Sequence, residues 1–111
     1  MKTDNCQNIL KYFLNLSDTD LLILKKYKGM DVKAERITED VGKDRSTICR
    51  SLSKIMDCGM ATKTKINIEK GGYYYIYHIQ DKDVLKDIMK KCSNKLVKKM
   101  EKAIKEIDSE F

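Results

Sequence analysis

The sequence has a single histidine, His78, and its four cysteines include no Cys-x-x-Cys pair. Zinc sites ordinarily need three or four His, Cys or acidic ligands at close spacing, so a metal site is not expected. The first residues, MKTDNCQNIL, hold no apolar stretch of the length that a secretory signal needs. We therefore expect Cys6, Cys49, Cys58 and Cys92 to be reduced and mostly packed, without forming a disulfide framework.

Long apolar runs and catalytic groupings are absent as well. No stretch approaches the roughly 18 apolar residues of a membrane span, so we expect a cytoplasmic protein without a membrane partner. There is no phosphate-cradling glycine loop, no pair of acids and no nucleophile beside a base at a recognisable spacing. His78 likewise lacks a partner for acid–base catalysis. An enzyme is therefore the weakest interpretation, and no cofactor is expected.

What the chain does contain is an excess of positive charge that is gathered in one part of it. The 111 residues carry a formal net charge of +6, with a pI near 9.1. Residues 42–72 hold seven Lys or Arg against three acids, whereas residues 30–41 hold two against four. Basic residues gathered on one face favour binding to a polyanion, although a plain solvated surface is the alternative. The length suits one domain, residues 1–111, with one core.

Apolar residues at helical spacing predict two helices near the start of the chain. The first covers residues 4–16 and has an amphipathic pattern. The second covers residues 18–27 and should be buried on most sides. Ser17 and Asp20 match a capping box at its start, in which the serine hydroxyl accepts from a backbone amide and the acid lies at the favourable end of the helix dipole.

A short helix and a polar-faced helix follow, with a tight turn between them. The short helix covers residues 33–41, and Gly42 suits the left-handed conformation at its C-terminal end. Asp44 can cap the next helix, which covers residues 45–58. The apolar residues of that helix lie within one narrow sector and should face the core: Ile48, Leu52 and Ile55. The opposite side carries Ser46, Arg50, Ser53 and Lys54.

Residues 60–68 and 73–79 alternate in the manner of two strands, with turn residues between them. A loop of two or four residues would pair even-numbered residues of the first strand with odd-numbered residues of the second. The odd-numbered tyrosines of the second strand should therefore pack inward beside Ile66 and Ile68. The lysines are then left on the outer face or at the tip: Lys63, Lys65 and Lys70.

No glycine or proline interrupts residues 81–110. A helix of roughly 28 residues would be about 42 Å long, which is too long for so small a domain to cover. Apolar residues recur along it every three or four positions, and this seam predicts a homodimer. The alternative is that the helix folds back on residues 4–15 of its own chain. The predicted dimerisation residues are Ile9, Phe13, Leu85, Met89, Cys92, Leu96, Met100, Ala103 and Ile107.

The order of these elements over residues 17–79 resembles a winged helix-turn-helix. The segment ERITEDVGKDRSTICRSLSKIMDCGMATK is similar to the DNA-reading part of archaeal and bacterial MarR-like and TrmB-like transcription regulators. GGYYYIYHI with a long helix after it is closer to the archaeal TrmB-type branch. The resemblance implies a mainly α fold with a small β-hairpin (α+β) and double-stranded DNA as the partner. The sugar-binding part of full-length TrmB proteins has no room here, so an effector is not carried over.

The chemistry of the polar residues agrees with that resemblance. Arg50 can hold guanine O6 and N7 with two hydrogen bonds in the major groove. Serine and threonine in the first turn of the helix suit phosphate or base contacts, and the flanking lysines and arginine suit phosphates. The wing, residues 63–74, would lie on the adjacent minor groove or backbone. The predicted DNA-binding residues are Lys43, Arg45, Ser46, Thr47, Arg50, Ser53, Lys54, Lys63, Lys65 and Lys70.

Each of these assignments has a structural alternative. Arg50 could pair with Asp57 or Glu39, and the wing lysines could simply protect an exposed strand from edge pairing. Tyr74 could stack on a partner, and Cys49 beside the polar face could be a redox switch, although a packed thiol is the plainer interpretation. A winged helix can also serve as a protein–protein interaction module in a transcription-related complex without touching bases.

Overall fold

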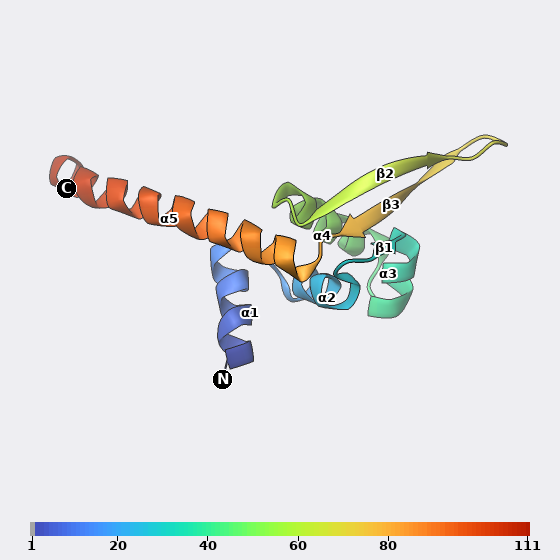
Figure 1. Cartoon of the computed structure of the whole chain (residues 1–111), viewed down its shortest axis with the longest axis horizontal. Helices are drawn as coiled ribbons and strands as arrows, with labels where there is room; N and C mark the ends of the chain where they lie inside the picture. The colour runs from blue at the N-terminus through green and yellow to red at the C-terminus, as the bar shows by residue number, and fades with distance from the viewer. Residues whose placement is uncertain (1) are drawn as a thin grey trace.

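A helix-turn-helix core lies between a projecting hairpin and a long C-terminal helix (Figure 1). The computed structural model describes residues 2–111, with side chains from residue 8 onward. In this part of the chain the elements are α1 (Lys2–Phe13), α2 (Asp18–Tyr27), β1 (Asp31–Val32), α3 (Ala34–Val41), α4 (Arg45–Asp57), β2 (Ala61–Asn67), β3 (Tyr73–Ile79) and α5 (Lys82–Glu110). The molecule measures 64 × 34 × 26 Å because α5 and the hairpin extend to opposite sides of the core.

The predicted mainly α fold with a small antiparallel sheet is confirmed, with one addition. The sequence reasoning missed β1, which pairs antiparallel with β3 and makes a three-stranded sheet of order β1-β3-β2. Asp31 lies opposite His78 in this pairing, and its carboxylate is 2.7 Å from Nδ1 of the histidine. A strand of two residues is too short for an alternating pattern to show, so the pattern of the sequence does not reveal it.

The core lies where α2, α3 and α4 meet the base of the sheet. Ile48, Leu52 and Ile55 of α4 are all fully buried there, as their spacing predicts. Ile23 of α2 and Ile37 of α3 are equally inaccessible. Each such aliphatic side chain contributes about 1.5 to 3 kcal/mol by leaving water. The apolar side of α4 is therefore anchored, and its opposite side is turned away from the core.

The capping box at the start of α2 is confirmed and is also the centre of a buried polar cluster. The Ser17 amide donates to Asp20 Oδ2 at 2.8 Å, and the Asp20 amide donates to Ser17 Oγ at 3.1 Å. The same carboxylate lies 3.2 Å from Lys54 Nζ of α4, and the Ser51 hydroxyl also donates to it. Burial raises the pKa of Asp20, but these hydrogen bonds and the ammonium outweigh burial and hold the pKa below its ordinary value.

A second polar contact joins α2 to α3. The Tyr27 hydroxyl donates to Asp40 Oδ2, and Arg36 Nε lies 3.2 Å from the same oxygen. Burial, with the neighbouring carboxylate, raises the pKa of Tyr27 to about 12. The phenol therefore stays protonated, as the donor that this contact needs.

The register of the hairpin differs from the prediction. β2 pairs with β3 so that Lys63 lies opposite Tyr77 and Lys65 opposite Tyr75. The Ile68 amide donates to the Gly72 carbonyl at 3.1 Å, which leaves three residues in the loop. An odd loop length reverses the face on which every side chain of one strand lies relative to the other strand. The wing lysines consequently share a face with the odd-numbered tyrosines, and the prediction that they lie on opposite faces was wrong.

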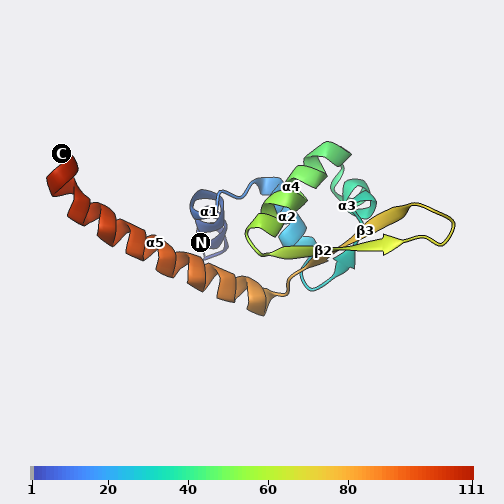
Figure 2. The same cartoon turned by 90° about the horizontal axis from the view of Figure 1, so that it is seen from above.

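The two terminal helices meet only over the first half of α5. α1 ends at Phe13, three residues before the predicted end, and Asn15 then takes a positive φ of 56°. Leu85 and Ile88 of α5 pack against the core, yet no residue of α5 is buried. Figures 1 and 2 show the rest of α5 running away from the other elements.

Three of the four cysteines have side chains that the structure describes. Cys49, Cys58 and Cys92 are free and half-buried. Burial raises the pKa of Cys58, which keeps its thiol protonated at neutral pH. Cys6 lies outside the residues whose side chains are described.

We expect Asp20→Asn to lower the free energy of unfolding by about 2 to 3 kcal/mol at neutral pH, because it removes the charge that Lys54 neutralises inside the protein. The folded pKa of Asp20 lies below its ordinary value of 3.8, so the stabilisation is complete above that value and is lost as the pH falls through the folded pKa. Urea denaturation at neutral pH and near pH 3 measures this, and the loss should be smaller in acid. Asp57→Asn, at the exposed end of α4, is the control. An equal loss at both pH values would contradict the assignment.

Candidate nucleic-acid interface

The turn between α3 and α4 orients the polar side of α4. Gly42 has φ 74°, and its amide donates to the Thr38 carbonyl at 2.9 Å, which closes α3. Asp44 then caps α4 by accepting from the Thr47 amide at 3.1 Å. Hydrogen bonds from Thr47 lower the pKa of Asp44, so the cap is ionised at neutral pH. Both predicted capping interactions are therefore present, and they direct the start of α4 outward.

The outer side of α4 presents small hydroxyl residues and one arginine. Ser46, Arg50 and Ser53 are exposed, and Thr47 is half-buried. Arg50 Nη2 lies 3.5 Å from Thr47 Oγ1, one turn earlier on the same side. Among the described residues, Arg50 pairs with neither of the acids that the sequence offers as alternatives. Its guanidinium is thus available to a partner that approaches this side of the helix.

Two other basic residues of α4 are already engaged within the protein. Lys54 is held by the buried Asp20, as described above. Arg45 Nη1 donates to Glu35 of α3, and this bond lowers the pKa of the Glu35 carboxyl. The pairing with Glu35 is exposed and of modest strength, whereas Asp20 is only 1% exposed. Lys54 therefore has a role in the fold that its position on the helix surface does not reveal.

The start of α2 lines the same surface as α4, which the sequence reasoning missed. A shallow cleft of about 290 Å³ separates the start of α2 from α4. It is lined by the N-cap Ser17 and Thr19 on one side and by Thr47, Arg50 and Lys54 of α4 on the other. The sequence pattern predicts that α2 is buried on most sides, so it does not indicate that the first turn of this helix lies at the surface beside α4. The packing of α2 against α4, which includes the contact between Asp20 and Lys54, brings Thr19 to the same cleft as Arg50.

The wing extends the basic surface past α4. Figure 2 shows the β2–β3 hairpin projecting beyond α3 and the start of α4. Lys63, Lys65 and Lys70 are all exposed along it, as is Lys43 in the turn before α4. Tyr74, considered as a stacking residue, instead has the Lys33 ammonium 4.0 Å from the centre of its ring.

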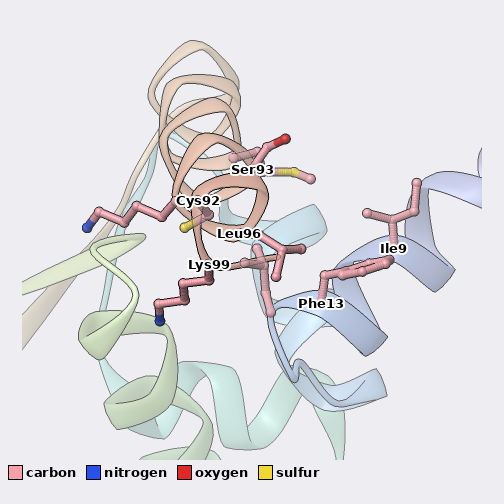
Figure 3. Close-up of a pocket in the computed structure, with 9 residues that line it drawn as sticks. Ile9, Phe13, Cys92, Ser93, Leu96 and Lys99 are labelled. Atoms are coloured by element: carbon pink, nitrogen blue, oxygen red, sulfur yellow. The ribbon is translucent and has the colours of Figure 1, made fainter. Parts of the chain in front are cut away.

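Most of the residues predicted for dimerisation lie on α5, and Ile9 and Phe13 lie on α1. Leu85 is half-buried against the core, and Met89 and Cys92 are half-buried beside α1. Leu96 faces Ile9 and Phe13 of α1 across a groove of about 400 Å³ (Figure 3). This placement agrees in part with the alternative in which α5 folds back on α1.

The far half of α5 is uncovered in the single chain. Met100 and Ile107 are 56% and 49% exposed, and Ala103 is exposed as well. These residues line a groove of about 430 Å³ together with Ile104, which the sequence reasoning left out of the seam although it is 64% exposed. The far half of α5 thus carries an apolar surface that the single chain leaves uncovered.

Among the described residues, no group of three or more His, Cys, Asp or Glu side chains comes together as a metal site. None of the helices in this part of the chain has the length and hydropathy needed to cross a bilayer.

The helices α2, α3 and α4 with the β2–β3 hairpin define a winged helix-turn-helix protein. Among solved structures, a possible transcriptional regulator from Methanosarcina mazei is similar, with a TM-score of 0.77, 25% identity, and coverage of 91% of this chain and 87% of that one. The ST1889 protein of Sulfolobus tokodaii has a TM-score of 0.66 at 21% identity over 94% of this chain and 99% of its own. The transcriptional regulator BldR of Sulfolobus solfataricus has a TM-score of 0.53 at 21% identity, over 94% of this chain and 81% of its own. The last two show the shared fold alone.

Comparison by sequence adds two archaeal relatives. The Methanocaldococcus jannaschii protein MJ1503, described as uncharacterized, is 33% identical over 78 residues, which are 70% of this chain and 59% of that protein. MJ1082 of the same organism, also described as uncharacterized, is 29% identical over 93 residues, 80% of this chain and 74% of its own. No family model matches the chain. The chain therefore shares its fold with a possible transcriptional regulator from an archaeon.

We expect Gly42→Ala to destabilise the protein by about 1 to 2 kcal/mol, because an L-residue is strained at φ 74°. No atom lies within 4 Å of the added Cβ, so the loss comes from the backbone alone. Gly42→Asn should cost less, since asparagine tolerates this conformation. Thermal unfolding of the three proteins tests this order, and an alanine variant as stable as the native protein would disprove it.

Proposed function

We propose that this protein is a sequence-specific, double-stranded-DNA-binding transcriptional regulator of the MarR-like and TrmB-like kind, acting as a homodimer. One observation carries the proposal: Ser46, Arg50 and Ser53 face outward from α4 while its other side is fully buried. Donors on a rigid helix beside a basic wing are what reading of a major groove requires. The likeness to a possible transcriptional regulator at 25% identity supports the same conclusion.

In this proposal α4 enters the major groove and the wing lies on the adjacent minor groove or backbone. Arg50 reads a base, and Ser46, Thr47 and Ser53 contact bases or phosphates. Lys43 and the wing lysines contact phosphates. Arg45 joins them by exchanging Glu35 for a phosphate, because their exposed ion pair is weak. Lys54 stays bound to Asp20 and fixes the angle between α4 and α2.

The proposal treats residues 1–111 as one winged-helix domain whose α5 pairs with α5 of a second copy. The helix has 29 residues and is about 43 Å long, and its exposed apolar groove lies far from α4. A pair of such helices would set the distance between two copies of α4, and hence between two half-sites. The charged flanks of α5 leave the pairing surface narrow and apolar.

We expect duplex binding to weaken steeply with salt and to depend on two kinds of residue. Arg50→Ala should cost about 1 to 3 kcal/mol on a selected duplex and much less on a random one, since it removes base readout. Lys65→Ala should weaken both duplexes alike and reduce the slope of log K against log salt by about 1. Fluorescence anisotropy on duplexes selected from a random pool measures both effects.

Lys105→Ala is the charge-matched control for these variants. Lys105 lies near the end of α5. Figure 1 shows that this helix and the hairpin extend to opposite sides of the core, so the loss of Lys105 should leave binding nearly unchanged. Equal losses on selected and random duplexes for Arg50→Ala would remove this residue from base readout.

We expect Ile104→Asp to convert a homodimer into a monomer, because it places a charge in the apolar groove of α5. Sedimentation equilibrium measures the change. Asn94→Asp adds the same charge on the other side of α5 and should leave the dimer intact. A native protein that is monomeric at all concentrations would contradict the homodimer.

A protein–protein interaction module is the second candidate, and the exposed apolar half of α5 is the observation that favours it. In that case α5 pairs with a different chain and no base is read. A stable monomer without salt-dependent duplex binding would support this candidate over the first.

A further inference from the structure

The exposed lysines of the wing are held by tyrosine rings. Lys63 Nζ lies 4.6 Å from the centre of the Tyr75 ring, and Lys65 Nζ lies 4.2 Å from the centre of the Tyr73 ring. The two rings contact each other edge to face, with centres 5.5 Å apart and planes at 72°. Lysine and tyrosine thus alternate along one face of the hairpin, which we call the tyrosine–lysine face (Lys63, Lys65, Tyr73 and Tyr75).

The register of the hairpin produces this arrangement. Lys65 lies directly opposite Tyr75, and each lysine reaches diagonally to the tyrosine one step nearer the tip. Diagonal neighbours in an antiparallel pair are within reach of long and aromatic side chains. With the predicted even-to-odd pairing the lysines would lie on the other face, away from these rings.

The tyrosine–lysine face looks toward the start of α4. It continues at its base into Tyr77, which is 8% exposed and belongs to the core. Arg45 and Cys49 of α4 are close enough to Tyr77 to influence its pKa, which burial raises. The tyrosine–lysine face thus adjoins, through Tyr77, the part of the molecule where α4 begins.

A lysine that lies over a ring loses part of its rotational freedom before any ligand arrives. A free lysine has up to about 2 kcal/mol of side-chain entropy to lose on being fixed. The ring occupies one side of the ammonium and leaves its remaining hydrogens to solvent, or to an anion. Lys63 and Lys65 are two residues apart on one strand, so their Cα atoms are about 6.7 Å apart, close to the separation of successive phosphates on a DNA strand.

The same contacts argue against base stacking. An aromatic platform for single strands needs ring faces open to the bases. Here one face of the Tyr75 ring lies under the Lys63 ammonium, and one face of the Tyr73 ring lies under the Lys65 ammonium. The two rings also contact each other edge to face. Anion contact is thus the interaction that the tyrosine–lysine face can make without rearrangement.

We propose that the tyrosine–lysine face is the surface by which the wing contacts the phosphate backbone of duplex DNA, with Tyr73 and Tyr75 as positioning residues for Lys65 and Lys63. This inference rests on the proposed function and adds to it two residues that make no contact with DNA themselves.

Duplex affinity of leucine and phenylalanine variants tests the inference. Tyr73→Leu and Tyr75→Leu remove the ring and should each weaken binding about two- to five-fold, as expected for an exposed cation–π contact. The phenylalanine variants keep the ring and should restore most of the affinity. Tyr12→Leu on α1 is the control for the loss of a surface tyrosine ring away from the wing. Tyr12 is 81% exposed, against 55% for Tyr73, and its replacement should leave the affinity unchanged.

A double-mutant cycle and a spectrum without DNA complete the test. Once Lys65 is replaced by alanine, Tyr73→Leu should have no further effect on affinity. In the free protein, the Lys65 ε-methylene protons should show an upfield ring-current shift that the leucine variant abolishes. Additive losses in the cycle, or an unshifted methylene in the native protein, would overturn the inference.

The two proposals fail in different ways. If the native protein binds no duplex, the proposed function fails, whatever the ring-current shifts are. If it binds duplex and Lys65→Ala weakens binding while Tyr73→Leu does not, only the inference about the tyrosines fails. Leucine variants that weaken binding to single-stranded DNA more than to duplex would identify a stacking surface in its place.

Discussion

The candidate interface depends on the contacts that the buried carboxylate of Asp20 makes with α2 and α4. This carboxylate closes the capping box of α2 with Ser17 and at the same time holds Ser51 and Lys54 of α4. A charge that is 1% exposed is tolerable only because it has these partners. The contact fixes α4 against α2 from the polar side, while the aliphatic residues fix it from the core. The outward direction of Arg50 follows from both.

Charge in this protein is used in two ways that its composition does not separate. The net charge of +6 counts Lys54 and Arg45 equally with Arg50 and the wing lysines. In the folded chain Lys54 neutralises a buried acid and Arg45 lies against Glu35, whereas Arg50 has only a long contact with a neighbouring hydroxyl. The basic surface is therefore smaller than the basic segment of sequence. It is extended by the wing, where the ammonium groups lie over rings that the hairpin supplies.

Most of the fold could be predicted, because the determining interactions are local. The helical spacing of apolar residues predicted α2, α3 and α4. The Ser17–Asp20 pattern predicted the cap of α2, and Gly42 predicted the turn that directs α4. The outward placement of Ser46, Arg50 and Ser53 follows from the same periodicity once Ile48, Leu52 and Ile55 are assigned to the core. Residues whose neighbours are distant in sequence could not be assigned: Thr19, Lys54 and the two positioning tyrosines.

The sequence by itself determined which segments form helices and strands and which side of α4 is apolar, since capping, turn chemistry and period act within a few residues. Only the tertiary structure decided that Lys54 serves the fold, that β1 joins the sheet, and that the wing lysines lie over tyrosine rings. Each of these depends on a pairing across the chain, and the last depends on a single residue of loop length. The alternation of side chains along each strand does not fix which faces of the two strands lie together, because the length of the turn sets the register between them.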